Sequence, residues 1–433
     1  MEKQRKIAYF HSILVMFLSP AYSLFHGLRS SFSHDSKRWL LIIFITIYGS
    51  VMTLSESNDG FRHLQTVHEH YVPLSFSQFL AEAWDILLFK TYGGTVEDLY
   101  IHTLSYFVGH VLRLPGLFFI FVSFIYAYFY AGSIFRLLRH IGRRKYHWVF
   151  YGFLVVFILM KNIEGINTVR TWTGLWILFY ACLSYYETKK KKYLILMFVP
   201  PLVHVGYFLM AIPAWIVLFA GTRSKLYPII FALSFVVNLP NTEGLLNRLN
   251  QTEIGAEKVE GYKVTPEQKA SEDFRNKVQS GSPWYFRLTE WGLHIWAVNL
   301  LAGAMIIFGL YSKKMNFLEA RLFSIGILTI AFSNFMWMLF AVANRSGLIG
   351  MLFVIAALLL LWQRGHLDHA YFGKAKLMHQ LIGLSLILLI PFIVYKIADL
   401  IYYVSIYVFA FPFIPWFTDG LNYSIREFIG FLI

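Results

Sequence analysis

Cysteine is almost absent from this chain of 433 residues: Cys182 is the only one, and it stands inside an apolar run. A disulfide within the chain needs two cysteines and a thiolate zinc site needs several, so the sequence excludes both. Charged residues are scarce as well. They make up 14% of the sequence, against about a quarter in ordinary soluble domains, which argues against a soluble globular protein.

Sequence motifs for nucleotides and metals are also missing. The chain has no GxxxxGK[ST] motif, which excludes the phosphate-binding loop of an ATP-driven transporter. It has no HExxH motif and no paired CxxC, so we predict no metal site and expect no cofactor. The predicted cytoplasmic loops are too short to hold a nucleotide-sugar domain.

Long apolar runs are abundant instead. Hydrophobic residues make up 57% of the chain and aromatic residues 19%, and stretches long enough to cross a bilayer as a helix recur along it. We therefore predict an all-α, polytopic transmembrane bundle of about 11–12 membrane segments that forms one domain over residues 1–433. The predicted segments lie near 39–55, 116–136, 146–161, 170–186, 193–203, 206–220, 226–239, 291–311, 318–341, 347–363 and 380–404.

Two further apolar stretches differ from these segments. Residues 7–25 are interrupted by Ser19-Pro20, so they either span the membrane or lie at its interface. The tail from Ser405 combines aromatic residues and prolines over a short length. This composition predicts an interfacial segment.

The formal net charge of +14 is concentrated in short basic loops. Such loops stay in the cytoplasm by the positive-inside rule, so the charge indicates membrane topology, and we expect no nucleic-acid partner. The basic loops are Lys37-Arg38, residues 136–145, 189–192, Arg223 with Lys225, 313–314 and 364–376.

The basic loops share one side only if residues 7–25 do not span the membrane and residues 193–220 form a hairpin of two short helices. Pro200-Pro201 favours this break, because proline lacks an amide donor and interrupts a helix. The hairpin places Arg170 and His204 on the same side of the membrane, the extracytoplasmic side.

Two long segments face the extracytoplasmic side in this topology. Residues 55–115 contain amphipathic stretches such as 75–89, which predict helices lying on the membrane surface. Residues 240–290 are polar and rich in both Glu and Lys. They predict a helical lid or a loop.

Asp59 and Arg62 follow the first firm span and are three positions apart, so they share one face of a helical turn. A carboxylate at the mouth of a membrane cavity can act as a general base on a sugar hydroxyl, or bind a metal. A solvated local ion pair is the simpler interpretation.

Glu164, Asn167 and Arg170 also recur every three residues and can line one helix face. Arg170 suits a diphosphate, because its planar guanidinium stays charged and donates two parallel hydrogen bonds. An arginine that snorkels to the interface is the alternative. His204 stands among apolar residues, where it can take a proton, pair with phosphate, or make a structural hydrogen bond.

Three more polar residues are expected at the outer face. Arg345 lies between two predicted spans, where a plain loop arginine is the alternative. Arg287 and Glu290 flank Trp284 and Tyr285. These rings either stack on sugars or belong to the aromatic belt of the membrane interface.

The order of these residues resembles the EpsG-type branch of the Wzy-like polysaccharide polymerases. The resemblance rests on Asn167 and Arg170 at the head of a span, a lysine-rich cytoplasmic loop, and a short span that ends at His204. Asp59 after an early span and Arg345 late in the chain are similar too. The chain departs from the branch at His63 and in its long 240–290 loop.

The resemblance, which extends over residues 40–365, implies a GT-C-like glycosyltransferase at the outer face of the bacterial inner membrane. Such an enzyme joins oligosaccharide repeat units, carried on undecaprenyl diphosphate, into O-antigen, capsule or exopolysaccharide. A chain-length regulator or other assembly proteins would be its partners. The implied catalytic residues are Asp59 and His204, the implied diphosphate ligands are Arg170, Arg345 and Arg62, and the implied secondary contacts are Glu164, Asn167, Arg287 and Glu290.

Three other classes of protein stay open. A membrane O-acyltransferase also uses an intramembrane histidine, but the companion motifs of that class are missing. A flippase for the same lipid-linked sugar needs a polar path through the membrane centre and usually internal repeats, and we find no repeat. A GT-C transferase with a lipid-monophosphate sugar donor needs an acidic residue in the first outer loop, which Asp59 supplies.

Overall fold

The computed structural model describes residues 2–54, 59–90, 98–140, 145–237, 282–290, 292–336, 340–365, 367, 374–418 and 422–432. These residues form α-helices with short 3₁₀ and π turns, and their only β-type pairing is an isolated bridge between Ser405 and Ser424. The prediction of an all-α membrane protein is therefore confirmed.

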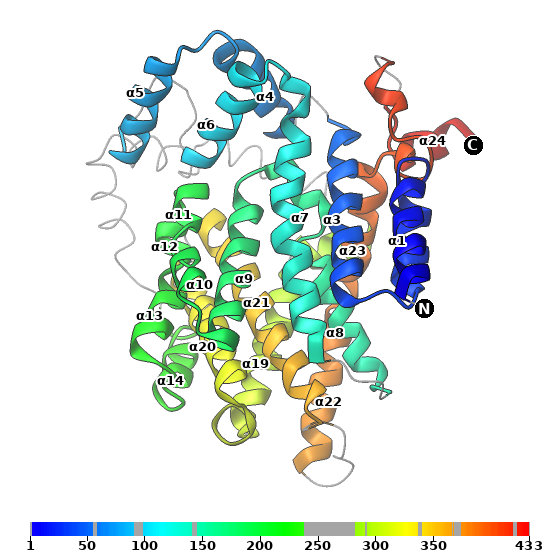
Figure 1. The fold of residues 1–433 in the computed structure, drawn as a ribbon. Coiled ribbons are helices and arrows are strands. Elements are labelled where there is room, and N and C mark those ends of the chain that lie inside the picture. The colour runs from blue at the N-terminus through cyan, green and yellow to red at the C-terminus, as the bar shows by residue number, and fades with distance from the viewer. Residues whose placement is uncertain are drawn as a thin grey trace.

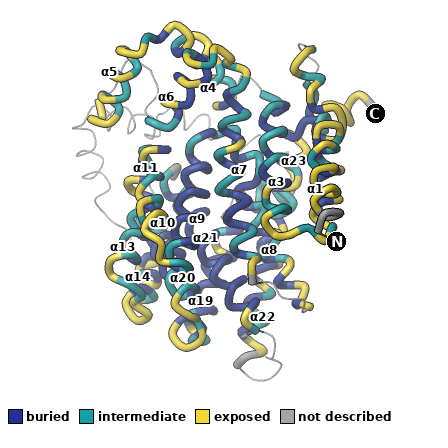
Figure 2. The backbone as a smooth tube through the Cα atoms, in the orientation of Figure 1, coloured by how far each residue is buried: buried dark blue, intermediate teal, exposed yellow. Residues whose placement is uncertain are grey.

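A bundle of long helices forms the body of the molecule (Figure 1). Its members are α3 (His34–Ser50), α7 (Phe118–Leu137), α8 (Trp148–Leu159), α9 (Thr171–Thr188), α19 (Leu293–Ile307), α20 (Phe317–Phe335), α21 (Phe340–Gln363), α22 (Lys374–Leu388) and α23 (Ile390–Tyr403). α9 and α21 run through the middle and are buried along most of their length (Figure 2). A helix that is apolar all round, as these two nearly are, must be covered by other helices.

Five helical segments are long and apolar enough to cross a bilayer, and α18 (Trp284–Glu290) with α19 makes a sixth if this bent pair is one span. The five are Pro115–Leu137, Trp148–Thr168, Phe317–Phe335, Val342–Gln363 and Lys376–Tyr403. This number, which covers the described residues, is smaller than the number of membrane segments expected from the sequence. Three of the expected segments that are missing from these spans lie between residues 193 and 239, and the other two, 39–55 and 170–186, correspond to α3 and α9.

Residues 191–233 form five short helices instead of long spans. They are α10 (Lys191–Leu196), α11 (Pro200–Val203), α12 (Tyr207–Met210), α13 (Ile212–Ala220) and α14 (Leu226–Leu233). Prolines stand at the first turns of α11 and α13, where the missing amide donor costs nothing but the previous helix must end. The expected break at Pro200-Pro201 is thus where α11 begins.

The N- and C-terminal segments lie together at one edge of the bundle (Figure 1). α1 (Glu2–Met16) ends just before the Ser19-Pro20 interruption, and α2 (Pro20–Arg29) begins there. The amide of Phe411 donates to the carbonyl of Leu18 over 2.7 Å and ties the two segments together. The remaining helices of the tail are η7 (Ile406–Val408), η8 (Ile414–Trp416) and α24 (Ile425–Leu432).

A layer of short helices covers one end of the bundle, at the top of Figure 1. It consists of α4 (Asp59–Thr66), η1 (Val67–Tyr71), α5 (Phe76–Leu87), α6 (Leu99–Tyr106) and η2 (Phe107–Val111). α5 has no buried residue and exposes Phe76, Leu80 and Trp84, as expected for a helix that lies on a membrane surface. Most of the predicted 240–290 loop lies outside the described residues.

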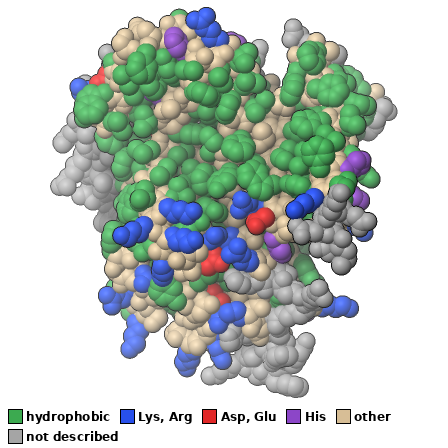
Figure 3. Space-filling view, in the orientation of Figure 1, with side chains coloured by type: hydrophobic (Ala, Val, Ile, Leu, Met, Phe, Trp, Pro, Cys, Tyr) green, Lys and Arg blue, Asp and Glu red, His purple; other side chains and the backbone are tan. Residues whose placement is uncertain are grey.

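Lysine and arginine side chains gather at the opposite end of the face seen in Figure 3, below a broad hydrophobic area. The loop after α9, with Lys189 and Lys190, belongs to this end (Figure 1). By the positive-inside rule we expect this end to face the cytoplasm and the α4–α6 layer to face the outer side.

Topology can be checked with single cysteines, because buried Cys182 is the only native thiol. In a Cys182→Ser background, Ser77→Cys on exposed α5 should react with a membrane-impermeant maleimide in cells in which the membrane that holds the protein is intact. Lys190→Cys, which is exposed at the basic end, should react only after the membrane is opened. Labelling of Lys190→Cys in intact cells would reverse the assignment.

The crossing of α20 and α21 depends on two glycines that face each other. A Cβ atom on Gly350 would lie 2.9 Å from the carbonyl oxygen of Gly326 and 3.0 Å from the amide of Ile330. Backbone atoms cannot move aside as a flexible side chain can. Close approach through small residues is a common way to pack membrane helices.

Gly350→Ala should therefore destabilise the protein by about 1–3 kcal/mol, the usual cost of overpacking a core. Thermal unfolding of the detergent-solubilised protein measures the effect. Gly383→Ala in α22 is the control, since a Cβ there meets nothing within 4 Å. Equal melting temperatures for the two variants would contradict this packing.

Candidate functional site

A buried carboxylate, Asp98, is the centre of the candidate site. It stands immediately before α6, yet its side chain does not cap that helix. The side chain is 0% exposed. Its Oδ2 accepts hydrogen bonds from Arg170 and from His204 Nδ1 at 3.3 Å, and its Oδ1 accepts from the amide of Val205 at 2.7 Å.

These donors keep Asp98 ionised. Burial alone would raise the pKa of its carboxyl, but the hydrogen bond from His204, the charge of Arg170 and the amide of Val205 together hold that pKa below its usual value. A carboxylate that accepts several hydrogen bonds favours its charged form in this way. Asp98 is therefore a permanent acceptor at physiological pH.

His204 links Asp98 to a second arginine. α11 ends at Val203, and His204 follows in extended conformation with its amide bonded to the carbonyl of Pro200. Its Nε2 lies 3.4 Å from Nη1 of Arg345, in α21. The guanidinium can only donate and the Asp98 carboxylate can only accept, so neutral His204 carries its proton on Nδ1 and has a lone pair on Nε2.

Arg170 is held by an unusual turn. The preceding residue, Val169, is fully buried and has φ +54°, a region that β-branched residues rarely adopt. The turn joins η5 (Ile163–Thr168) to α9 and leaves Arg170 at the start of α9. Backbone strain of this kind persists only where the surrounding packing fixes it, and it often marks functional sites.

We call Arg170, Asp98, His204 and Arg345 the outer-face network. Its members come from four separate parts of the chain and meet below α6, at the outer ends of α9 and α11 (Figure 1). Among the described residues, two arginines face one carboxylate in this network, so with neutral His204 these residues carry a surplus of one positive charge. An anionic group is the ligand that such a surplus favours.

α4 packs over η5 next to this network. A Cβ on Gly60 would lie 2.5 Å from Oδ1 of Asn167, so glycine permits the close approach. Burial and the charge of Arg170 lower the pKa of His63 to about 4, which leaves this ring neutral at physiological pH. Asp59 and Arg62 pair with each other on the same helix and stay more than half exposed.

Glu164 belongs to a different group of charges. Its Oε2 accepts a hydrogen bond from Lys396 Nζ at 3.0 Å, and the same ammonium donates to Asp399 at 2.7 Å. Glu164 and Glu290 line a cavity at the outer end of the bundle together with Lys161. Five of the sequence-predicted residues thus divide between two places: Arg170, His204 and Arg345 in the network, and the two glutamates at the cavity.

Arg287 lies on α18 with Glu290 and is partly exposed. Among the described residues it does not line the cavity that Glu290 borders. The described residues contain no cluster of three or more His, Cys, Asp and Glu side chains arranged to hold a metal ion.

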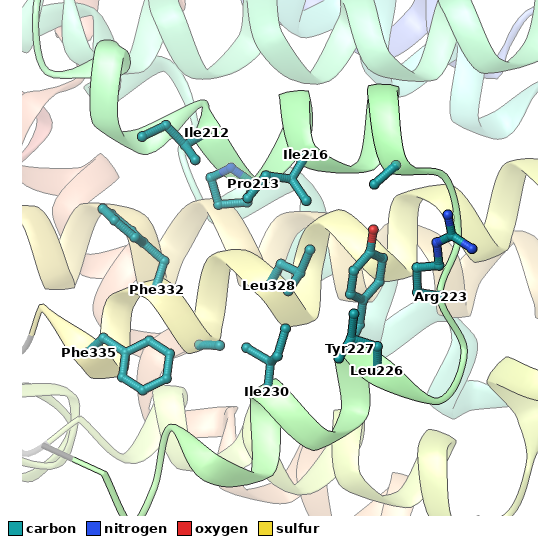
Figure 4. A pocket seen from close by; sticks show the side chains of 12 residues that line it. Ile212, Pro213, Ile216, Arg223, Leu226, Tyr227, Ile230, Leu328, Phe332 and Phe335 are labelled. Carbon is teal, nitrogen blue, oxygen red and sulfur yellow. The ribbon is translucent and has the colours of Figure 1, made fainter. Parts of the chain in front are cut away.

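A second hollow, of about 320 Å³, lies between α13, α14 and α20 (Figure 4). Its walls are almost wholly apolar and include Ile212, Ile216, Leu328 and Phe332. Arg223 at one end is its charged residue. The groove suits a hydrocarbon chain.

The sequence did not single out Asp98, Lys161 or Lys396. Asp98 occurs in VEDLYIHTL, where an acidic residue opens an apolar helical run; this resembles an ordinary helix start. Lys161 is a lone cation at the end of one apolar run, and Lys396 lies inside the predicted segment 380–404. A buried charge within a membrane segment is itself a signal, because it needs a partner.

The fold and the site define a multi-pass, all-helical membrane protein with a buried ionic network at its outer end. The chain belongs to the EpsG family, whose match covers residues 89–370, more than half of the sequence. This family of membrane proteins is linked to polysaccharide biosynthesis. The matched region contains the whole outer-face network, whereas Asp59 and Arg62 precede it. No curated protein and no solved structure matches the chain.

Removal of Asp98 should destabilise the protein strongly. Asp98→Ala leaves Arg170 without its buried carboxylate, and the loss of one partner from a buried ion pair costs about 3–5 kcal/mol. Asp59→Ala is the matched control, because exposed ion pairs contribute only about 0–1 kcal/mol. The melting temperatures of the two purified variants measure these losses of stability. If Asp59→Ala melts at as low a temperature as Asp98→Ala, burial of the ion pair is not the cause of the lost stability.

Proposed function

We propose that the chain is a polysaccharide polymerase of the bacterial inner membrane. It joins oligosaccharide repeat units carried on undecaprenyl diphosphate at the outer face of that membrane. The observation that supports this most is the outer-face network, in which a proton acceptor, Nε2 of His204, lies 3.4 Å from Arg345, while Asp98 on the other side of the ring binds Arg170. A base next to a cationic diphosphate site is what this transfer requires.

The arginines bind the leaving group. The growing chain is attached through its anomeric carbon to undecaprenyl diphosphate, and the bond from that carbon to the phosphate oxygen breaks with its electron pair on the oxygen. Arg345 and Arg170 donate to the diphosphate oxygens and neutralise this charge. The 3.4 Å between Arg345 and His204 is long for a hydrogen bond, so a phosphate oxygen can replace the imidazole as partner of Arg345.

His204 is then available for the acceptor. A hydroxyl of the incoming unit gives its proton to Nε2 as its oxygen attacks the anomeric carbon. The product is a chain one repeat unit longer, on the carrier of the incoming unit, and free undecaprenyl diphosphate. Asp98 holds the ring in the required tautomer and stabilises the imidazolium, and is therefore a positioning residue.

Asp59, Arg62 and Asn167 lie at the outer side of the network, on α4 and η5. We assign them to contacts with the approaching unit. The half-exposed Asp59 carboxylate is a second candidate for orienting the acceptor hydroxyl, but it has no contact with His204 comparable to that of Asp98. The apolar groove of Figure 4 is suited to a prenyl chain.

Deletion of the gene in its host should leave single repeat units on lipid at the outer face of the inner membrane, with no long polysaccharide. Complementation with His204→Gln should restore chain growth about 10²–10⁴-fold less well than the wild type, the usual contribution of a general base. Arg345→Lys should also reduce chain growth, because an ammonium lacks the planar guanidinium that donates two parallel hydrogen bonds. Gel electrophoresis of the polysaccharide and mass spectrometry of the lipid-linked units measure both effects.

Lys190→Ala at the opposite, exposed end is the control and should complement fully. Immunoblots of membranes must show equal amounts of each variant. Chains of normal length in the His204→Gln strain would exclude this role for the histidine. Repeat units trapped at the inner face in the deletion strain would indicate a flippase.

A further inference from the structure

The cavity at the outer end of the bundle, about 500 Å³, is not used by the mechanism above. Its size falls in the range of roughly 300–1,000 Å³ that is usual for small-molecule sites. The cavity adjoins the outer-face network: Asn344 lines its wall, and the next residue, Arg345, contacts His204. A molecule bound there would extend toward the reacting groups.

Three polar side chains in the cavity wall have unused hydrogen-bonding capacity. Nδ1 of His294 and Oδ1 of Asn299 have no partner, although these residues are only 7% and 9% exposed. The ammonium of Lys161 lies 4.0 Å from the ring centroid of Trp172 and makes no ion pair or hydrogen bond within the described residues. A buried polar atom without a partner costs about 1–3 kcal/mol, so all three favour a ligand that brings donors and acceptors.

The charges of the cavity argue against a phosphate ligand. Lys161 and Lys396 are matched by Glu164 and Glu290, so the lining has no positive surplus. Lys396 is also bonded directly to Glu164. The charge of the outer-face network, in which two arginines face one carboxylate, favours an anionic ligand more than the charge of the cavity does. The cavity instead suits an uncharged polar molecule.

Aromatic rings form much of the remaining wall. Phe235, Trp296, Phe392 and Tyr395 line the cavity, and the ring of His294 stacks on Phe392 with 5.1 Å between centroids. Aromatic faces combined with a few placed polar groups can bind the C–H faces and the hydroxyls of a sugar ring. The apolar groove of Figure 4 has no comparable set of polar groups.

We propose that this cavity is a sugar-binding subsite that takes uncharged pyranose rings. Lys161 donates to sugar oxygens, while Asn299 and Glu290 accept from hydroxyls. This proposal rests on the proposed function only for the source of the sugar, which would be the oligosaccharide of the lipid-linked unit. Binding itself can be measured without chain growth.

The probe is the water-soluble repeat-unit oligosaccharide, released by mild acid from the lipid-linked units of the deletion strain. Isothermal titration of purified protein should detect its binding. His294→Phe retains the ring that stacks on Phe392, and Asn299→Leu retains the volume. Each should weaken binding at least about tenfold, a loss of roughly 1.4 kcal/mol. Asn299→Leu should not lower the melting temperature, because the Oδ1 atom that it removes has no partner.

Ser184→Ala is the matched control, since its buried hydroxyl also lacks a partner but lies in α9 away from the cavity. It should bind the oligosaccharide as the wild type does. Unchanged binding by both cavity variants, or no binding by the wild type, would overturn the subsite. If His204→Gln supports normal chain growth while His294→Phe loses binding, the proposed reaction site fails and the subsite stands.

Discussion

The structure of the outer end depends on one buried carboxylate. Asp98 is removed from solvent, and an ionised group in such a place must be met by donors on every side. Its donors come from the start of α9 and from the segment after α11, so the carboxylate fixes how α6 sits on both. The proline break before His204 and the left-handed Val169 before Arg170 bring these donors within reach.

The same carboxylate sets the balance of charges in the outer-face network. It accepts from one arginine and from a histidine, and the histidine faces a second arginine. The remaining positive charge and the free lone pair of His204 therefore lie next to each other. In the proposed reaction these two features serve the leaving diphosphate and the attacking hydroxyl, and the charge-balanced cavity beside them serves the sugar.

Much of this arrangement can be predicted from the sequence, because the signals are local. Apolar length predicts the membrane helices, and Pro200-Pro201 predicts the break that returns His204 to the side of Arg170. The number of membrane spans is harder to predict. Prolines divide residues 191–233 into short helices, and an apolar window does not reveal where each short helix turns. The surface helix at 76–87 follows from its amphipathic pattern.

The partners of the polar residues are the part that local signals miss. Glu164 and Arg170 are six positions apart but contact groups on different helices, Lys396 and Asp98. Both contacts join distant parts of the chain, so spacing along one helix cannot reveal them. Asp59 is the more conspicuous acid in the sequence, yet the buried Asp98 is the one that meets His204.

The central claim is that Asp98 acts through His204. A double-mutant cycle on the rate of chain growth by purified, reconstituted protein tests it most directly. If the claim holds, Asp98→Asn lowers the rate in the wild-type background and lowers it little further in His204→Gln, because the group it positions is already gone. Losses that multiply independently in the double variant would contradict it.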